Sequence, residues 1–184
     1  MADRREFFRT LLRPLEKQGE GRGASEAKPT LSIRPPYALS ESLFQSRCPE
    51  CVDHACVGAC EESILLIAAD GTPILNPTQR GCTFCEACAE ACQEGVLDLR
   101  KGAQRINAQF FIEADRCLSH HGTICFACKE PCIDDAILFE GMFRPVIDAQ
   151  RCTGCGFCMG RCPTGAIGYE TLPIPDESKE PDEA

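Results

Sequence analysis

The chain has 184 residues, a formal net charge of −9, 16 cysteines and no tryptophan. This acidic balance argues against a nucleic-acid-binding protein, because phosphate contacts need a basic face. The longest apolar run, residues 64–69, is too short for a signal-peptide core or a membrane span. We therefore expect the thiols in a reducing cytoplasm, where cysteines bind metals more often than they form disulfides.

Residues 1–35 are predicted to be a basic N-terminal segment. Arg4 and Arg5 precede an aromatic pair, as in a twin-arginine leader, but charged residues interrupt the apolar core that export requires. Apolar residues from Phe8 to Leu15 fall at helical spacing and predict a short amphipathic helix within residues 1–17. This helix could dock a partner, touch the membrane surface at most peripherally, or pack on the chain. Residues 19–29 are predicted to be a linker.

The cysteines fall into four groups whose first members are separated by 34, 35 and 35 residues, so the chain is an internal repeat. Two of the groups follow the pattern C-x2-C-x2-C-x3-C, and the other two have a longer loop near the start. The groups are Cys48, Cys51, Cys56 and Cys60; Cys82, Cys85, Cys88 and Cys92; Cys117, Cys125, Cys128 and Cys132; and Cys152, Cys155, Cys158 and Cys162.

Each connector between two groups is predicted to be a strand, a turn and a strand. Asp70-Gly71 and Glu140-Gly141 mark two of these turns. The three residues between the third and fourth cysteine of each group suit a short helical turn. Strand, cysteine loop and helical turn together are typical of half of a ferredoxin fold, which predicts the α+β class.

The cysteine spacing favours [4Fe–4S] clusters. Three cysteines of a C-x2-C-x2-C loop wrap around one cluster, and in two-cluster ferredoxins the fourth cysteine of the run binds the other cluster. The alternative is structural zinc, but zinc sites usually pair two short cysteine knuckles across a dozen or more residues. We expect four [4Fe–4S] clusters, and the cysteines carry the chemistry.

Groups one and three depart from the regular spacing. Four residues separate Cys51 from Cys56, and seven separate Cys117 from Cys125. A changed cluster type or a lower occupancy remains an alternative at these two groups. Each longer loop contains histidine, at His54 in one and at residues 120–121 in the other. Because no cysteine is missing, we expect these histidines to face solvent or lie behind the ligands.

Connector lengths bear on which groups share clusters. The connectors have 21, 24 and 19 residues, and the longest suits a link between modules, which favours tandem pairing over nested pairing of group one with four and two with three. We number the predicted sites 1 to 4. Site 1 is Cys48, Cys51, Cys56 and Cys92; site 2 is Cys82, Cys85, Cys88 and Cys60; site 3 is Cys117, Cys125, Cys128 and Cys162; site 4 is Cys152, Cys155, Cys158 and Cys132.

Four predicted regions follow from this pairing. Residues 36–108 are the first ferredoxin-like module and residues 109–172 the second, after the N-terminal segment 1–35. The acidic, proline-rich tail 173–184 is expected to be disordered. Arginines stand just before the first cysteine of each group, at Arg47, Arg80, Arg116 and Arg151. They either stabilise reduced clusters and dock a partner, or cap strand ends and pair with carboxylates.

Several features together resemble the NapF family of ferredoxin-type proteins of periplasmic nitrate reductase systems. They are the Arg-Arg-aromatic start, the stretch IRPPYALSESLF before the first group, and the seven-residue gap in group three. The resemblance covers residues 1 to about 170. It implies a cytoplasmic protein with four [4Fe–4S] clusters that acts on the nitrate reductase catalytic subunit before export.

We therefore expect an electron carrier or maturation accessory without substrate chemistry of its own. We expect it to be a monomer that forms transient complexes with a redox protein. The resemblance points to maturation of, or electron supply to, the nitrate reductase catalytic subunit. The alternative is an electron-transfer subunit of another multi-subunit, molybdenum-type oxidoreductase.

Overall fold

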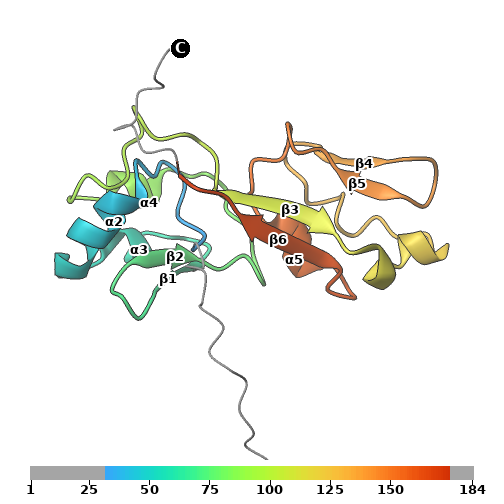
Figure 1. The fold of residues 1–184 in the computed structure, drawn as a ribbon, viewed down its shortest axis with the longest axis horizontal. Helices are drawn as coiled ribbons and strands as arrows, with labels where there is room; N and C mark the ends of the chain where they lie inside the picture. Colours follow the sequence, from blue (N-terminus) through green and yellow to red (C-terminus); the bar gives the residue numbers. More distant parts are fainter. Residues whose placement is uncertain (1–31, 175–184) are drawn as a thin grey trace, which may run out of the picture. The chain divides into compact units, whose positions relative to one another are not determined.

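Residues 32–174 are described by the computed structural model, and they fold into short helices and small antiparallel sheets (Figure 1). The α+β class predicted from the repeat is confirmed. The helix predicted within residues 1–17 and most of the tail 173–184 lie outside the described residues. None of the helices within the described part is long and apolar enough to cross a membrane.

The helices of this part are short. They are α2 (Glu41–Arg47), α3 (Ala55–Gly58), α4 (Ala87–Glu90) and α5 (Phe157–Arg161), with the 3-10 turns η1 (Cys48–Glu50), η2 (Ala114–Arg116) and η3 (Ser119–His121). Helices α3, α4 and α5 are the helical turns predicted near the end of three cysteine groups. In group three the corresponding residues form a turn instead, in which the Lys129 and Glu130 amides donate to the Phe126 carbonyl.

Two connectors are hairpins, as predicted. Strand β1 (Leu65–Ile67) pairs with β2 (Pro73–Leu75), and β4 (Ile137–Phe139) pairs with β5 (Pro145–Ile147). Gly71 has φ +80° and Gly141 has φ +71°. These left-handed conformations favour glycine, and they let the chain reverse within a few residues.

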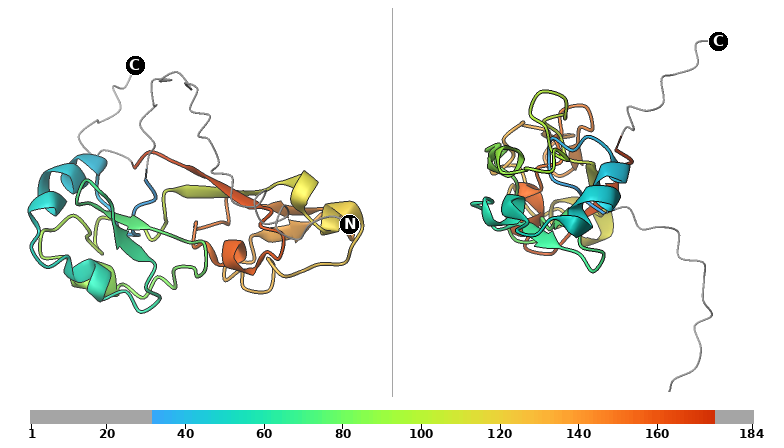
Figure 2. Two further views of the ribbon diagram at one scale, coloured as in Figure 1. Left: turned by 90° about the horizontal axis from the view of Figure 1, so that it is seen from below. Right: turned by 90° about the vertical axis from the view of Figure 1, so that its left-hand side faces the viewer.

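The connector between groups two and three differs from the prediction. Its second strand, β3 (Ala108–Ile112), pairs with β6 (Ile167–Thr171) at the end of the described chain. Its first part makes an isolated bridge between Leu97 and Ala38. The first part of this connector therefore pairs with the start of residues 38–97. Its second part pairs with the end of residues 108–171. The β4–β5 hairpin lies against the β3–β6 pair (Figures 1 and 2).

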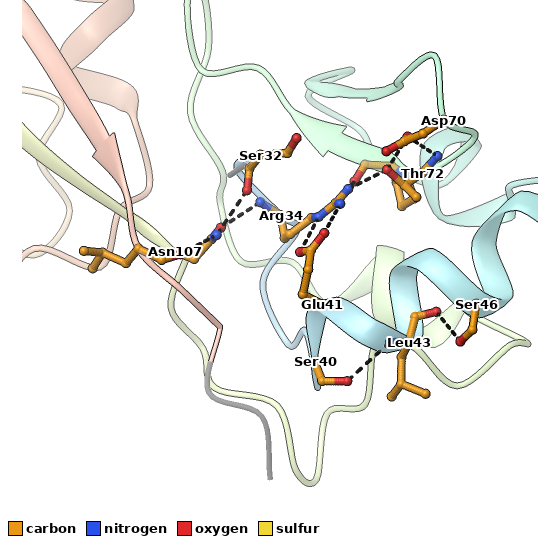
Figure 3. Close-up of polar contacts among 11 residues, drawn as sticks. Ser32, Arg34, Ser40, Glu41, Leu43, Ser46, Asp70, Thr72 and Asn107 are labelled. Carbon is orange, nitrogen blue, oxygen red and sulfur yellow. Dashed lines mark hydrogen bonds and ion pairs between the residues drawn. The ribbon is translucent and has the colours of Figure 1, made fainter. Parts of the chain in front are cut away.

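A buried arginine holds the segment before group one in place. Arg34 is 2% exposed, forms an ion pair with Glu41, and donates to the Thr72 hydroxyl at 2.7 Å and the Pro73 carbonyl at 3.0 Å (Figure 3). Its guanidinium also lies 4.7 Å from the centre of the Phe44 ring, a cation–π distance. These contacts fix the segment around Arg34 to α2, which leads into the first cysteine group, and to β2.

The same segment is tied to the end of the described chain. The Arg34 amide donates to the Asn107 side-chain oxygen at 2.7 Å, and the Asn107 side-chain amide donates to the carbonyls of Ser32 and Leu172 (Figure 3). One polar side chain thus joins three separate stretches of backbone where the β3–β6 pair begins.

Candidate metal centres

Three cavities in the described part of the chain are each lined by four cysteines. Each set contains three cysteines of one group and the last cysteine of another group. The first cavity is lined by Cys60, Cys82, Cys85 and Cys88; the second by Cys117, Cys125, Cys128 and Cys162; and the third by Cys132, Cys152, Cys155 and Cys158. These are the thiols predicted for sites 2, 3 and 4.

The thiols predicted for site 1 also lie together. The pKa of Cys48 is raised to about 11, mainly by burial and then by the nearby thiols of Cys56, Cys92 and Cys51 in that order. The pKa of Cys56 is likewise raised to about 11, mainly by burial and then by the nearby thiols of Cys92 and Cys51. Each of these effects requires the charged groups to be close in space.

Burial raises the pKa of eight of the sixteen thiols, so these eight stay protonated at neutral pH in the absence of metal. It raises the pKa of Cys82 and Cys128 to about 11 and that of Cys88 to about 12, with neighbouring cysteines adding to the effect. Because a metal binds the thiolate, loading these sites releases protons.

Cys162 behaves differently from the other buried cysteines. Burial raises the pKa of its thiol, but hydrogen bonds from the Ala166 amide, at 3.1 Å, and from Thr164 together bring the pKa below its usual value. The Ala136 amide makes the equivalent contact with Cys132, at 3.2 Å. Both are the fourth cysteines of their groups. A backbone amide that donates to the sulfur stabilises its negatively charged form.

The two regular cysteine loops share an unusual backbone. Phe84 and Glu86 in group two have φ +55° and +68°, and Gly154 and Gly156 in group four have φ +79° and +84°. Left-handed residues that alternate with ordinary ones turn successive amides toward one side, forming a concave nest for anions such as iron–sulfur clusters. Only group four uses glycine at both positions, which avoids the strain that Phe84 and Glu86 accept.

The seven-residue loop of group three folds on itself. Ser119 is fully buried in η3 and donates to the Cys125 carbonyl at 2.9 Å, and the Thr123 amide donates to the Leu118 carbonyl at 3.0 Å. These bonds bring Cys125 back beside Cys117, so that the insertion leaves four thiols around one cavity.

The histidines stand away from the cysteine cavities. His120 and His121 are exposed, and their Nε2 atoms contact the backbone carbonyls of Pro145 and Asp115 at 3.4 and 2.9 Å. His54 caps α3 in a left-handed conformation. None of the three is among the residues that line the cavities of sites 2, 3 and 4.

Tyr37 is a residue near site 2 that the spacing argument did not identify. It is 3% exposed, and its buried hydroxyl lies beside the Glu86 carboxylate without a well-formed hydrogen bond to any residue within 32–174. Burial raises the pKa of Tyr37, and the charges of Glu86, Cys82 and Cys88 raise it further, so the hydroxyl lies beside two thiols of site 2. A buried donor without a well-formed hydrogen bond is costly, and the sulfur of a cluster at site 2 would accept one from this hydroxyl, in competition with the Glu86 carboxylate.

The arginines before the cysteine groups all reach the loop that follows a fourth cysteine. Arg47 donates to the Glu94 carbonyl at 2.6 Å, Arg116 to the Thr164 carbonyl at 3.1 Å, and Arg151 to the Asp135 carbonyl at 3.3 Å. The loop reached is, each time, the one after the cysteine predicted to complete the same site. The fourth arginine forms an ion pair with Glu62, at 3.8 Å, just after Cys60.

The chemistry of these sites fits a cubane cluster. Within residues 32–174, no group of three or more His, Cys, Asp and Glu is placed to hold a metal ion. A cubane spreads four thiolates over four irons, so its ligands lie farther apart than those of one zinc ion. Four thiols around a cavity, with amides directed at sulfur, meet that requirement.

Comparison with known proteins agrees with this chemistry. Residues 145–168, which include all of group four, match the family model described as a 4Fe-4S binding domain. The ferredoxin-type protein NapF of Escherichia coli K12 is 38% identical over 149 residues, which cover 79% of this chain and 88% of NapF.

Two other ferredoxin-type proteins are similar over a comparable length. NapG of Escherichia coli K12 is 30% identical, covering 93% of this chain and 86% of NapG. The methylamine utilization protein MauM of Methylorubrum extorquens is 31% identical, covering 84% of this chain and 77% of MauM. The resemblance inferred from the sequence is confirmed: the chain belongs to the NapF family of ferredoxin-type, [4Fe–4S]-binding proteins.

Proposed function

We propose that the chain binds four [4Fe–4S] clusters in two tandem ferredoxin-like modules, residues 36–108 and 109–172, and acts as an electron carrier. One observation carries this proposal: in each of three cavities, three thiols of one cysteine group meet the last thiol of its neighbour. That crossing is the ligand pattern of two-cluster ferredoxins. Groups one and two share sites 1 and 2, and groups three and four share sites 3 and 4.

Strand pairing also favours tandem over nested modules. The bridge between Ala38 and Leu97 encloses groups one and two, and the β3–β6 pair encloses groups three and four. Each enclosed run contains one hairpin between its two cysteine groups. Each run therefore places a cysteine group, a hairpin and a second cysteine group, in that order, between its two paired ends.

A bound [4Fe–4S] cluster accepts and releases one electron, and the chain controls that exchange. Cysteine thiolates hold the cluster in place, and buried apolar residues such as Phe84 and Ile167 line the cavities and exclude water. Amides directed at Cys132 and Cys162 offset negative charge on sulfur. Burial and hydrogen bonds to sulfur are the means by which a protein sets a cluster potential.

We place this carrier in the cytoplasm, beside the catalytic subunit of a periplasmic nitrate reductase before its export. This step rests on membership of the NapF family. The protein would assist maturation of that subunit or supply it with electrons, without substrate chemistry of its own. The alternative function is an electron-transfer subunit of another multi-subunit, molybdenum-type oxidoreductase; the relatives NapG and MauM show that ferredoxin-type proteins of this kind are not confined to NapF.

A deletion strain separates the two roles of the accessory. We expect binding of the unexported catalytic subunit to the wild-type protein, measured by co-purification under anaerobic conditions. If deletion lowers the cluster content of that subunit, the protein acts in maturation. If cluster content stays normal and only reduction of the subunit is lost, the protein supplies electrons. If neither changes, the nitrate reductase assignment is wrong.

A further inference from the structure

We propose that the four sites form one unbranched electron path in the order 1, 2, 4, 3, joined between the modules at a hydrogen bond from Cys82 to Cys155. This inference rests on the proposed function, and it adds the route. An electron that moves one step oxidises the site it leaves and reduces the site it enters. No bond forms and no proton moves. The electron enters from a low-potential one-electron donor.

Neighbouring sites within a module share a helical turn. The third and fourth cysteines of a group are four residues apart, and the two belong to different sites. Cys56 and Cys60 flank the end of α3 in this way, and Cys128 and Cys132 flank the turn in group three. Helix α3, which contains Cys56, also packs against α4, which contains Cys88. Site 1 is therefore next to site 2, and site 3 next to site 4.

The modules meet at ligands of sites 2 and 4. The Cys82 amide donates to the Cys155 carbonyl at 2.7 Å. Cys82 lines the cavity of site 2 and Cys155 that of site 4. One hydrogen bond thus joins the backbone of a ligand of one site directly to the backbone of a ligand of the other.

Glycines allow this close approach. A Cβ atom on Gly81, which is buried, would lie 2.5 Å from the Phe157 amide nitrogen, and one on Gly160 would lie 2.3 Å from the Gln79 carbonyl oxygen. Neither position has room for a side chain unless backbone moves. The segment before Cys82 therefore packs backbone to backbone against the cysteine loop of group four.

Sites 1 and 3 are at the two ends of the series. Within residues 32–174, none of the described hydrogen bonds joins a cysteine of site 1 or site 3 to the other module. An electron that crosses between the modules therefore has its shortest route through sites 2 and 4, and sites 1 and 3 are left to exchange electrons with partners.

Magnetic interaction between reduced clusters tests the order. Two alanine variants each remove two sites, with two ligands replaced per site so that no partial cluster remains. The first keeps sites 2 and 4, and the second keeps sites 1 and 3. They are C51A/C92A/C117A/C125A and C60A/C85A/C132A/C152A. Each should retain about eight irons, four per cluster.

After reduction with dithionite, the first variant should give a broadened, split EPR spectrum, because its two clusters are neighbours. The second should give two narrow, independent signals. With about eight irons in each variant, independent signals in the first or splitting in the second would overturn the order. Iron contents that do not match two clusters would instead overturn the ligand sets on which the proposed function rests.

Less substituted variants keep the order testable if the quadruple variants do not fold. Removing site 2 alone, with C60A/C85A, should leave site 1 isolated and produce a narrow signal. Removing site 1 alone, with C51A/C92A, should produce no narrow signal, because sites 2, 4 and 3 remain adjacent. A narrow signal in the second variant, or none in the first, contradicts the series.

Discussion

At the scale of single residues, the cysteines could be predicted from sequence and their hydrogen-bond partners could not. The spacing identified the four thiols that line each of three cavities. Tyr37 lies 11 residues before the first cysteine group, within the stretch IRPPYALSESLF that carries the family resemblance, but the cysteine spacing gives it no role at a site. Its position at site 2 comes from its left-handed backbone, φ +65°, and from burial, neither of which spacing encodes.

Replacing Tyr37 by phenylalanine should lower the reduction potential of the site 2 cluster. A donor to sulfur favours the reduced, more negative state, and a difference of about 1 kcal/mol in hydrogen-bond strength corresponds to about 40 mV for one electron. Redox titration followed by EPR measures this shift. Tyr169→Phe is the control, because Tyr169 is 40% exposed and lies on β6. Equal potentials in Tyr37→Phe and the wild type would show that the hydroxyl does not contact the cluster.

Replacing Arg34 by methionine should destabilise the chain by about 3 kcal/mol, the lower end for breaking a buried ion pair. Glu41 is 27% exposed, so water partly compensates its lost partner. The control is Arg100→Met, because Arg100 is 88% exposed in its pair with Asp98 and should contribute less than about 1 kcal/mol. Anaerobic guanidinium denaturation measures both. A similar loss in the two variants would contradict the structural role of Arg34.

Among the helices and strands, local sequence patterns predicted the hairpins but did not predict the long-range strand pairing. Gly71 and Gly141 marked two turns correctly, because a tight reversal needs a left-handed residue. The connector after group two has similar strand propensity, yet β3 pairs with β6, more than 50 residues away along the chain. Helix α2 was also not predicted; its Ser40 cap and its one fully buried residue, Phe44, give too short a periodic signal.

The arginine contacts link two cysteine groups around one site. Arg116 precedes Cys117 and donates to the Thr164 carbonyl, which follows Cys162, so it joins both sides of site 3. It also pairs with Glu113 at 3.1 Å. Of the two roles considered for these arginines, the contacts favour the structural one, in which they cap backbone and pair with carboxylates.

Replacing Arg116 by methionine should therefore speed the loss of the site 3 cluster. Weakening the site by about 1 kcal/mol, as expected for a lost hydrogen bond, should increase the rate of chelator-driven iron release about fivefold. Absorbance decay under anaerobic conditions reports this rate. Arg144→Met is the control, since Arg144 is exposed on the β4–β5 hairpin. Unchanged release from the Arg116 variant would mean that its hydrogen bond does not hold the two groups together.

At the scale of the whole molecule, the apolar core is thin and cysteines form part of it. Only a few large side chains within residues 32–174 are fully buried, among them Phe44, Ile106 and Ile137, and several buried positions are ligand cysteines such as Cys56 and Cys158. Composition predicted this shortage of core, but only the structure shows that six of the cysteines are buried within it. Bound clusters would then act as cross-links between segments far apart in the chain.

Removal of iron should accordingly unfold much of the protein. After treatment with a chelator and an oxidant, heating should produce little change in the far-UV circular dichroism signal. Residues 32–174 should also become accessible to protease. Both effects follow because the free energy of ligand binding to the metal contributes to folding. Anaerobic reconstitution with iron and sulfide should restore protection. A metal-free chain that keeps its cooperative thermal transition would show that the core is sufficient without clusters.

The chain is proposed to hold four cubane clusters, one at each set of four thiols. Quantitation of iron and acid-labile sulfide in protein purified without oxygen tests this proposal most directly. We predict about sixteen irons and a similar amount of sulfide per chain, with reduced clusters visible by low-temperature EPR. About eight irons, or iron without sulfide, would contradict the account, and the irregular groups one and three would be the first to re-examine.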